Sequence, residues 1–202
     1  MFRLEKPAQA FVDRQLAAAR ALPSACPSLL RLNADLTRTR LPLGFAHDRS
    51  TSVIGRGHSE FESARRAFLQ WAQFDLGWVR VANPLASVAP GQLIAVEAHT
   101  AGLWSLNISR ILETVNTPTR FGFLYATTRM HVEEGEERFV LELDPASGQL
   151  CYLIEAVSRP RHPLARLAWP FARAMQHRFA RDSHIRMRRL SSMPAASRVD
   201  PG

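Results

Sequence analysis

Between Trp78 and Pro160 the apolar residues recur in steps of two, whereas the segments on either side repeat at helical spacing. A period of two is that of an extended strand, in which successive side chains point to opposite faces. We count six strand candidates in this stretch, at residues 78–82, 92–99, 103–115, 120–128, 136–143 and 149–158. Turn sequences such as Pro90-Gly91 separate most of them. The connections are too short for crossover helices, so we expect an antiparallel meander.

Helical patterns flank the strand region, at residues 8–22, from 59 to about 77, and from 160 to 190 with a break at Trp169-Pro170. The second helix is expected to start with a capping box formed by Ser59 and Glu62. A short strand is predicted at residues 49–54. This order predicts an α+β fold, in which a curved antiparallel sheet of six or seven strands packs on a long C-terminal helix and carries an N-terminal helical extension.

The same pattern divides the chain into three parts. Residues 1–45 are interpreted as an N-terminal helix and wrapping segment, residues 46–190 as the main domain, and residues 191–202 as a flexible tail. No division of the main domain is expected, because a single domain can readily be as long as these 202 residues.

The composition limits the class of protein. Hydrophobic residues make up 46% of the chain, which is enough for a core, but no apolar run reaches the ~18 residues of a transmembrane helix. Charged residues near the N-terminus replace the apolar centre of a signal peptide, so we expect a cytoplasmic protein. Two cysteines, Cys26 and Cys151, suggest neither a disulfide framework nor a zinc cluster. No metal or cofactor is expected.

The formal net charge of +8 is concentrated near the C-terminus. Residues 159–190 contain nine arginines and one acid, Asp182, so the other 17 basic and 17 acidic residues balance. On a helical wheel these charges form a stripe that includes Arg166, Arg173, Arg181 and Arg188. The stripe is either a solvated helix face or a contact for an anionic membrane surface. Nucleic acid is not expected as a partner, because no aromatic residues interleave with these arginines to stack on bases.

A set of short motifs from the middle of the chain onward resembles a family of bacteria and plants called domain of unknown function 1990. The motifs are Asn107-x-x-Arg110, Phe123-x-Tyr125-x-Thr127, His131, Gly135-Glu136-Glu137-x-Phe139, Ser158-Arg159-Pro160 and Pro170 followed by Gln176. The resemblance extends from about Leu32 to Leu190. It departs from the usual family pattern at Ala126, Thr128 and Met130, where the family has other residues. It implies no biochemical activity. The element order is similar to that of the START-like (SRPBCC) helix-grip proteins, which implies a cavity for a small apolar molecule between sheet and helix.

Arg110 is the most informative single residue of the strand pattern. The alternation places it on the same face as Trp104, Leu106, Ile108 and Leu112, and we expect this face to point inward. A buried guanidinium needs a partner, and Glu137 is the expected one. Arg110 is then either half of a structural ion pair or the group that orients a carboxylate or phosphate head of a ligand.

The main functional hypothesis is that the protein binds a small apolar or amphipathic ligand between its sheet and its last helix. The predicted ligand-binding residues are Trp104, Arg110, Tyr125, Thr127, Glu137, Phe139 and Met175. One alternative is an enzyme that uses His131 and Glu137 as acid and base in the same pocket, although His131 is more readily interpreted as a loop bridge. Another is a peripheral module that binds anionic membranes through the arginine stripe. The sequence predicts no oligomeric state.

Overall fold

The computed structural model describes residues 2–22, 30–32, 41–131, 133–161 and 169–193. The strands are β1 (Phe2–Arg3), β2 (Ala46–Arg56), β3 (Val79–Val81), β4 (Leu93–Thr100), β5 (Leu103–Asn116), β6 (Arg120–Thr127), β7 (Glu133–Leu143) and β8 (Gln149–Pro160). The helices are α1 (Gln9–Arg20), α2 (Gly57–Leu69), the short 3-10 helix η2 (Ala72–Phe74) and α4 (Trp169–Ser191).

One antiparallel sheet contains all the strands, in the order β2-β8-β7-β6-β5-β4-β3. Strands β3 to β8 follow one another as a meander, and β2 returns to the far edge beside β8. The remaining strand, β1, pairs with the start of β5, in the part of β5 that β6 does not reach. The α+β class and the six or seven sheet strands predicted from the sequence are confirmed. The two-residue β1 was not predicted.

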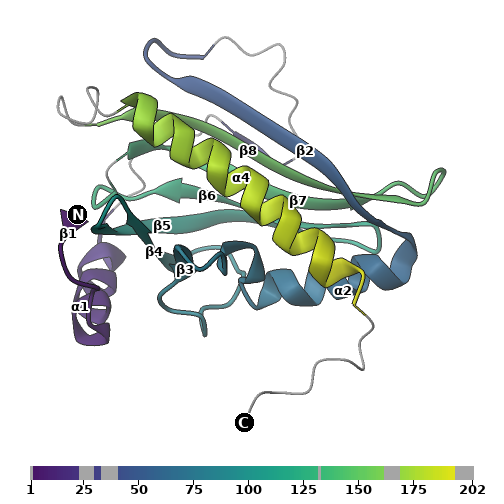
Figure 1. The fold of residues 1–202 in the computed structure, drawn as a ribbon, viewed down its shortest axis with the longest axis horizontal. Coiled ribbons are helices and arrows are strands. Elements are labelled where there is room, and N and C mark those ends of the chain that lie inside the picture. Colours follow the sequence, from purple (N-terminus) through teal and green to yellow (C-terminus); the bar gives the residue numbers. More distant parts are fainter. Residues whose placement is uncertain (1, 23–29, 33–40, 132, 162–168, 194–202) are drawn as a thin grey trace.

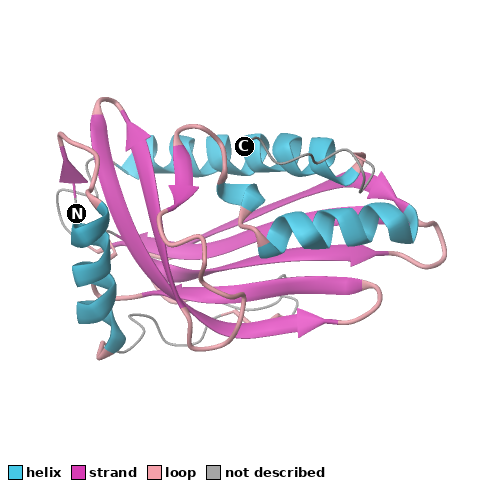
Figure 2. Cartoon of the chain, turned by 90° about the horizontal axis from the view of Figure 1, so that it is seen from below, coloured by secondary structure: helices cyan, strands magenta, loops and turns pink. Residues whose placement is uncertain are grey.

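The long helix α4 lies across the concave face of the curled sheet, with α2 beside it (Figure 1). Figure 2 shows both helices on the same side of the sheet. Aromatic side chains from α2 and from the sheet strands interdigitate beneath them, and the best-buried are Phe61, Phe68, Phe123, Phe139 and Tyr152. This is the helix-grip arrangement that the element order predicts.

The starts of two helices differ in how well the sequence predicts them. Trp169-Pro170 opens α4, as expected for a proline in the first helical turn. The predicted segment between Pro160 and this point falls on residues 162–168, outside the described residues. The predicted capping box is wrong, because α2 starts at Gly57, before Ser59, and Glu60 accepts a hydrogen bond from the backbone N–H of Arg56 at 2.8 Å.

The convex face of the sheet is covered as well, and this changes the interpretation of β5. Helix α1 packs Val12 and Ala19 against the even-numbered residues Leu106 and Ile108. Leu30 and Leu32 cover the next part of the same face. The even-numbered face of β5 therefore points outward toward the N-terminal segment, which corrects the expectation that it points toward the C-terminal helix. The alternation could not distinguish the two faces, because both are buried under other parts of the chain.

Candidate functional site

A cavity of about 1190 Å³ lies between the concave face of the sheet and α4. Its walls are largely apolar, and the side chains that make them so are Phe74, Trp78, Val79, Val96, Ala98, Ile154, Phe171, Met175 and Phe179. They come from η2, the sheet strands and α4, and Trp78 lies just before β3. A cavity of this size and lining suits a small organic molecule with a substantial apolar part.

Tyr125 and Glu137 form the polar centre of the cavity floor. They face each other on neighbouring strands β6 and β7, and the Tyr125 hydroxyl donates to Oε2 of Glu137 at 2.5 Å. Burial raises the pKa of Glu137 from its usual 4.5 to about 7, although the hydrogen bond from Tyr125 opposes the change. Burial, reinforced by the charge of Glu137, also raises the pKa of Tyr125 above its usual range. Tyr125 therefore keeps its proton, whereas Glu137 can gain or lose one near neutral pH.

A second polar group connects the floor of the cavity to the helix. Gln176 of α4 donates through Nε2 to Oε2 of Glu133 at 2.9 Å. The Ser158 hydroxyl of β8 also bonds to Glu133, and burial raises the pKa of this carboxyl. Glu133, Gly135 and Glu137 alternate along β7, so the two carboxyl groups lie on the same face of the sheet.

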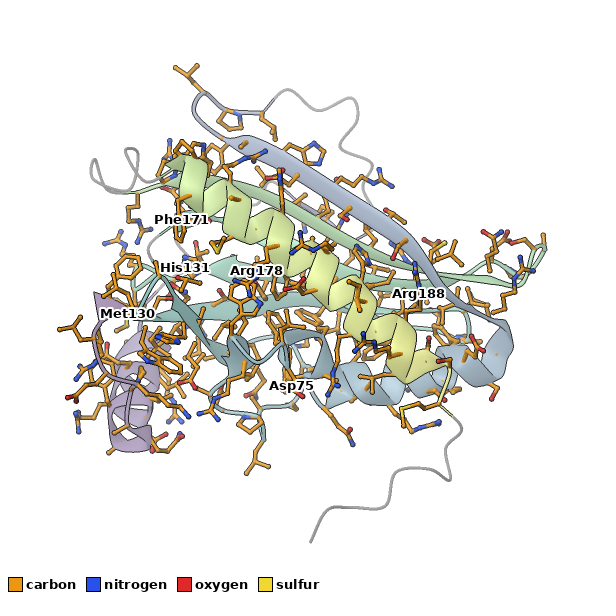
Figure 3. The ribbon with its side chains drawn as sticks, viewed as in Figure 1. Asp75, Met130, His131, Phe171, Arg178 and Arg188 are labelled. Carbon is orange, nitrogen blue, oxygen red and sulfur yellow. The ribbon has the colours of Figure 1, made fainter. Side chains whose placement is uncertain are left out.

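His131 lies in the loop between β6 and β7, at the end of the cavity where α4 begins. Figure 3 shows it at the same end as Phe171, whereas Arg188 lies toward the opposite end of α4. Its Nδ1 accepts a hydrogen bond from the backbone N–H of Glu133 at 3.0 Å. Burial lowers the pKa of His131 to about 3, so the ring is neutral at physiological pH. This geometry matches the loop-bridging interpretation of the residue, and its role as an acid or base stays a prediction.

At the other end of the cavity, His184 of α4 is held between two serines of β2. The Ser50 hydroxyl lies 3.0 Å from its Nε2 and the Ser52 hydroxyl lies 2.8 Å from its Nδ1. Burial lowers the pKa of His184 to about 4. The ring also packs edge-on against Tyr152, so His184 serves to attach α4 to the edge of the sheet.

The predicted ligand-binding residues separate into two groups. Tyr125, Thr127, Glu137 and Met175 line the cavity. Phe139 is fully buried beneath it, where its ring packs against Phe74, Phe123, Tyr125 and Phe179. Trp104 lies on the opposite face of the sheet and stacks on His99, with 4.6 Å between the ring centroids.

Arg110 is also on the outer face, and the predicted pair with Glu137 is not formed. Its guanidinium donates to the backbone carbonyls of Ala19, Arg20 and Leu22 at 3.0–3.1 Å. These carbonyls belong to the C-terminal end of α1 and the residues just after it, where a cation is favoured by the helix dipole. Arg110 therefore fastens α1 to the sheet rather than facing the cavity.

A buried ion pair does exist on the outer face, between different residues. Arg138 of β7 bonds through Nε to Oε2 of Glu155 at 2.7 Å, and both side chains are almost completely buried. Arg138 also donates to the backbone carbonyl of Leu32 at 3.2 Å, and Glu155 bonds to His47 at 2.7 Å. The sequence argument correctly requires a partner for a buried arginine but assigns that need to the wrong residue.

The described members of the arginine stripe are partly neutralised by neighbouring groups. Arg173 pairs with Asp48 of β2, and Arg188 donates to the backbone carbonyl of Val53 at 2.9 Å. Arg181 lies 3.3 Å from Asp182 and keeps 65% of its side chain exposed. Arg166 lies outside the described residues. Contact with an anionic membrane surface stays a prediction, as does the absence of a nucleic-acid partner.

Glu133 and Gln176 are the site residues that sequence reasoning missed. Glu133 was assigned to a turn because the strand was expected to begin at residue 136, whereas β7 begins at Glu133. Gln176 was noticed as a motif residue and given no role. Its position beside Met175 and one turn before Phe179, two residues of the apolar face, is the signal that could have identified it.

The described residues contain neither a metal-binding cluster nor a membrane-spanning helix. No group of three or more His, Cys, Asp or Glu side chains among them could hold a metal ion. Within the same residues, no helix is both long enough and apolar enough to cross a membrane.

The chain matches known proteins over most of its length. A family model described as "Domain of unknown function (DUF1990)" matches residues 32–186. A UPF0548 protein of Dictyostelium discoideum is 32% identical over 150 residues, which cover 69% of each chain. A UPF0548 protein of Deinococcus radiodurans is 34% identical over 139 residues, covering 63% of this chain and 69% of the relative. The resemblance inferred from the motifs is confirmed.

Solved structures share the fold at low sequence identity. The di-domain ARO/CYC protein BexL from the BE-7585A biosynthetic pathway is similar with a TM-score of 0.55 and 15% identity, over 78% of this chain and 52% of BexL. The di-domain ARO/CYC protein StfQ from the steffimycin biosynthetic pathway gives a TM-score of 0.51 and 8% identity, over 73% of this chain and 50% of StfQ. At these identities the similarity establishes the fold alone.

Proposed function

The chain belongs to the family described as a domain of unknown function (DUF1990), and we propose that it binds a small amphipathic molecule in the cavity between the sheet and α4. The observation that carries this proposal is the combination of a largely apolar cavity of about 1190 Å³ with a hydrogen-bonded polar pair, Tyr125 and Glu137, on its floor. Binding sites for small molecules have this composition, in which apolar walls supply affinity and a few polar groups fix orientation.

The arrangement of the walls suggests how the ligand lies. Phe171, Met175 and Phe179 of α4 face the sheet from above, and Trp78 and Val96 close one side. An apolar body enclosed by these side chains would lose its contact with water, at about 25 cal/mol for each Å² of apolar surface buried. The polar head is then placed beside Tyr125, Thr127 and Glu137, and these three remain our predicted ligand-binding residues on the floor.

An enzyme that uses the same cavity is the second candidate, favoured by one observation. The pKa of Glu137 is raised by burial to about 7, the range in which a carboxyl group can both accept and donate a proton at physiological pH. The Tyr125 hydroxyl bonded to it would hold the carboxyl in position. In this form of the proposal, Glu137 carries out the proton transfer and His131 maintains the loop.

The binding proposal is tested with an uncharged fluorescent apolar probe, N-phenyl-1-naphthylamine, and with native mass spectrometry of the purified full chain. We expect the probe to bind and its fluorescence to rise, and a co-purifying small molecule would add support. Ala98→Phe and Ala156→Phe place bulk in the cavity wall and should each weaken probe binding about tenfold or more. Ala146→Phe, in the exposed turn between β7 and β8, is the matched control. Absence of probe binding, or equal binding by all three folded variants, would contradict the proposal.

A further inference from the structure

Three hydrogen-bond donors at the polar end of the cavity are already engaged. Tyr125, Ser158 and Gln176 each offer a donor there, and each already donates to one of the two carboxyl groups. Building on the proposed binding function, we propose that the head of the ligand is a hydrogen-bond donor, an amine or a hydroxyl, and not a carboxylate, phosphate or sulfonate.

Gln176 gives the first line of support. Its Nε2 is committed to Glu133, which fixes the orientation of the amide and directs Oε1 away from that carboxyl. Oε1 is buried and has no hydrogen-bond partner within the described part of the chain. A buried acceptor without a partner costs free energy, and a donor brought by a ligand would remove that cost.

Asn107 repeats the pattern on a different element. It lies on β5, on the cavity side of the sheet, and its Nδ2 bonds to the Ser105 hydroxyl at 3.3 Å. Its Oδ1 is buried and, over the described ranges, also lacks a partner. Two amide oxygens on separate elements, one on the sheet and one on the helix, thus lack a donor among the described residues.

The charges around the cavity favour the same class of ligand. Glu133 and Glu137 both line the cavity, and the charged form of either carboxyl group would repel a negative head. Of the arginines that line the cavity, Arg188 bonds to the carbonyl of Val53 and Arg181 lies 3.3 Å from Asp182. Arg49 and Arg161 also line the cavity, and an anionic head would be drawn to these cations instead.

Three probes with the same apolar chain separate the alternatives: decylamine, decanol and decanoate. Their affinities for the full chain are measured near neutral pH by displacement of N-phenyl-1-naphthylamine, below the concentrations at which they form micelles. We expect decylamine or decanol to bind about tenfold more tightly than decanoate. Decanoate binding as tightly as both others, or more tightly, would overturn the inference. Failure of all three to bind would instead overturn the binding function on which the inference rests.

Two variants test whether the buried acceptor of Gln176 makes the protein prefer donor-headed probes over decanoate. Gln176→Leu removes the open acceptor and should weaken the better donor-headed probe about tenfold, while changing decanoate by less than about twofold. Glu142→Gln removes a carboxyl group from an exposed position on the same strand as Glu137, and should leave all three affinities unchanged. If Gln176→Leu folds but lowers the affinity for all three probes equally, the substitution has disturbed the general packing of the cavity. That result would contradict the role assigned to Gln176.

Discussion

Tyr125 on β6 lies directly opposite Glu137 on β7, and its hydroxyl donates to the Glu137 carboxyl at 2.5 Å. Both side chains line the cavity between the sheet and α4. Burial alone would raise the pKa of Glu137 further than the value of about 7 at which it rests, because the hydrogen bond from Tyr125 stabilises the charged form. The pair therefore keeps one titratable group at the cavity floor within reach of physiological pH.

Replacing Tyr125 by phenylalanine tests this relationship. Tyr125→Phe removes the hydrogen bond that favours the carboxylate, so the pKa of Glu137 should rise above its wild-type value, as followed by NMR titration of the side-chain carboxyl carbon. Unfolding experiments above neutral pH should show a loss of about 1–3 kcal/mol, because a buried carboxylate loses a partner. Tyr152→Phe, which removes a buried hydroxyl bonded to Ser183, is the control. A pKa of Glu137 that stays unchanged in Tyr125→Phe would contradict the assignment.

Glu137 also predicts how stability depends on pH. Its pKa in the folded protein is about 7, above the usual 4.5, so the stabilisation is complete below about pH 4.5 and is lost as the pH rises through 7. The free energy of unfolding should fall by up to about 3 kcal/mol over this interval through this one group. In Glu137→Gln this contribution should be missing, so the stability of the variant relative to wild type should increase from acid to neutral pH. The free energy of unfolding is measured by denaturant unfolding at several pH values in this range. If wild type and Glu137→Gln show the same pH dependence, Glu137 is not the titrating group.

Arg110 is predicted to stabilise the docking of α1 and to leave the cavity unaffected. Arg110→Ala removes the donor to three carbonyls at the end of α1 and should cost about 1–3 kcal/mol in the free energy of unfolding. Arg20→Ala removes an exposed side chain at the same helix end and keeps the carbonyls, so its cost should stay within about 0.5 kcal/mol. Binding of N-phenyl-1-naphthylamine should be the same in both variants and wild type. Weaker probe binding in Arg110→Ala would contradict this prediction and indicate that Arg110 faces the cavity.

The sequence predicts the architecture well, because the change from a helical to a two-residue period marks where the sheet begins and ends. Local turn chemistry then favours antiparallel neighbours, and Trp169-Pro170 marks the start of α4. What the period cannot determine is which face of a strand points toward the cavity. In β5 both faces are covered, by α1 on one side and by the cavity elements on the other, so Arg110 and Trp104 could be placed on either.

Site residues on the sheet were predicted where they fall inside a predicted strand, as Glu137 does in 136–143. Tyr125 and Thr127 belong to β6, whose observed bounds differ little from the predicted 120–128. Glu133 was missed because β7 begins three residues earlier than predicted. The role of Gln176 depends on contact with a residue 43 positions away in sequence, and local patterns carry no information about such a pairing.

The buried pair of Arg138 and Glu155 leads to the largest predicted loss of stability. Arg138 is 4% exposed and Glu155 is fully covered, so Arg138→Ala leaves a buried carboxylate whose remaining partner among the described residues is His47. This should lower the free energy of unfolding by about 3–5 kcal/mol, measured by chemical denaturation. Arg159→Ala is the matched control, because Arg159 pairs with Glu134 at 3.0 Å but is 41% exposed, and its cost should be below about 1 kcal/mol.

The double variant Arg138→Met with Glu155→Leu removes both charges of the pair but keeps side chains of similar volume. Apolar residues of similar volume can replace a buried ion pair with little loss, since neither charge then has to be taken out of water. The double variant should therefore be more stable than Arg138→Ala, even though it also removes the bond from Glu155 to His47. Equal losses in Arg138→Ala and Arg159→Ala would mean that the Arg138 pair is as well solvated as the surface pair. A double variant less stable than Arg138→Ala would contradict the idea that the unpaired Glu155 carboxylate is the main cost of Arg138→Ala, because both variants lose the contacts of Arg138 with the carbonyls of Arg31 and Leu32.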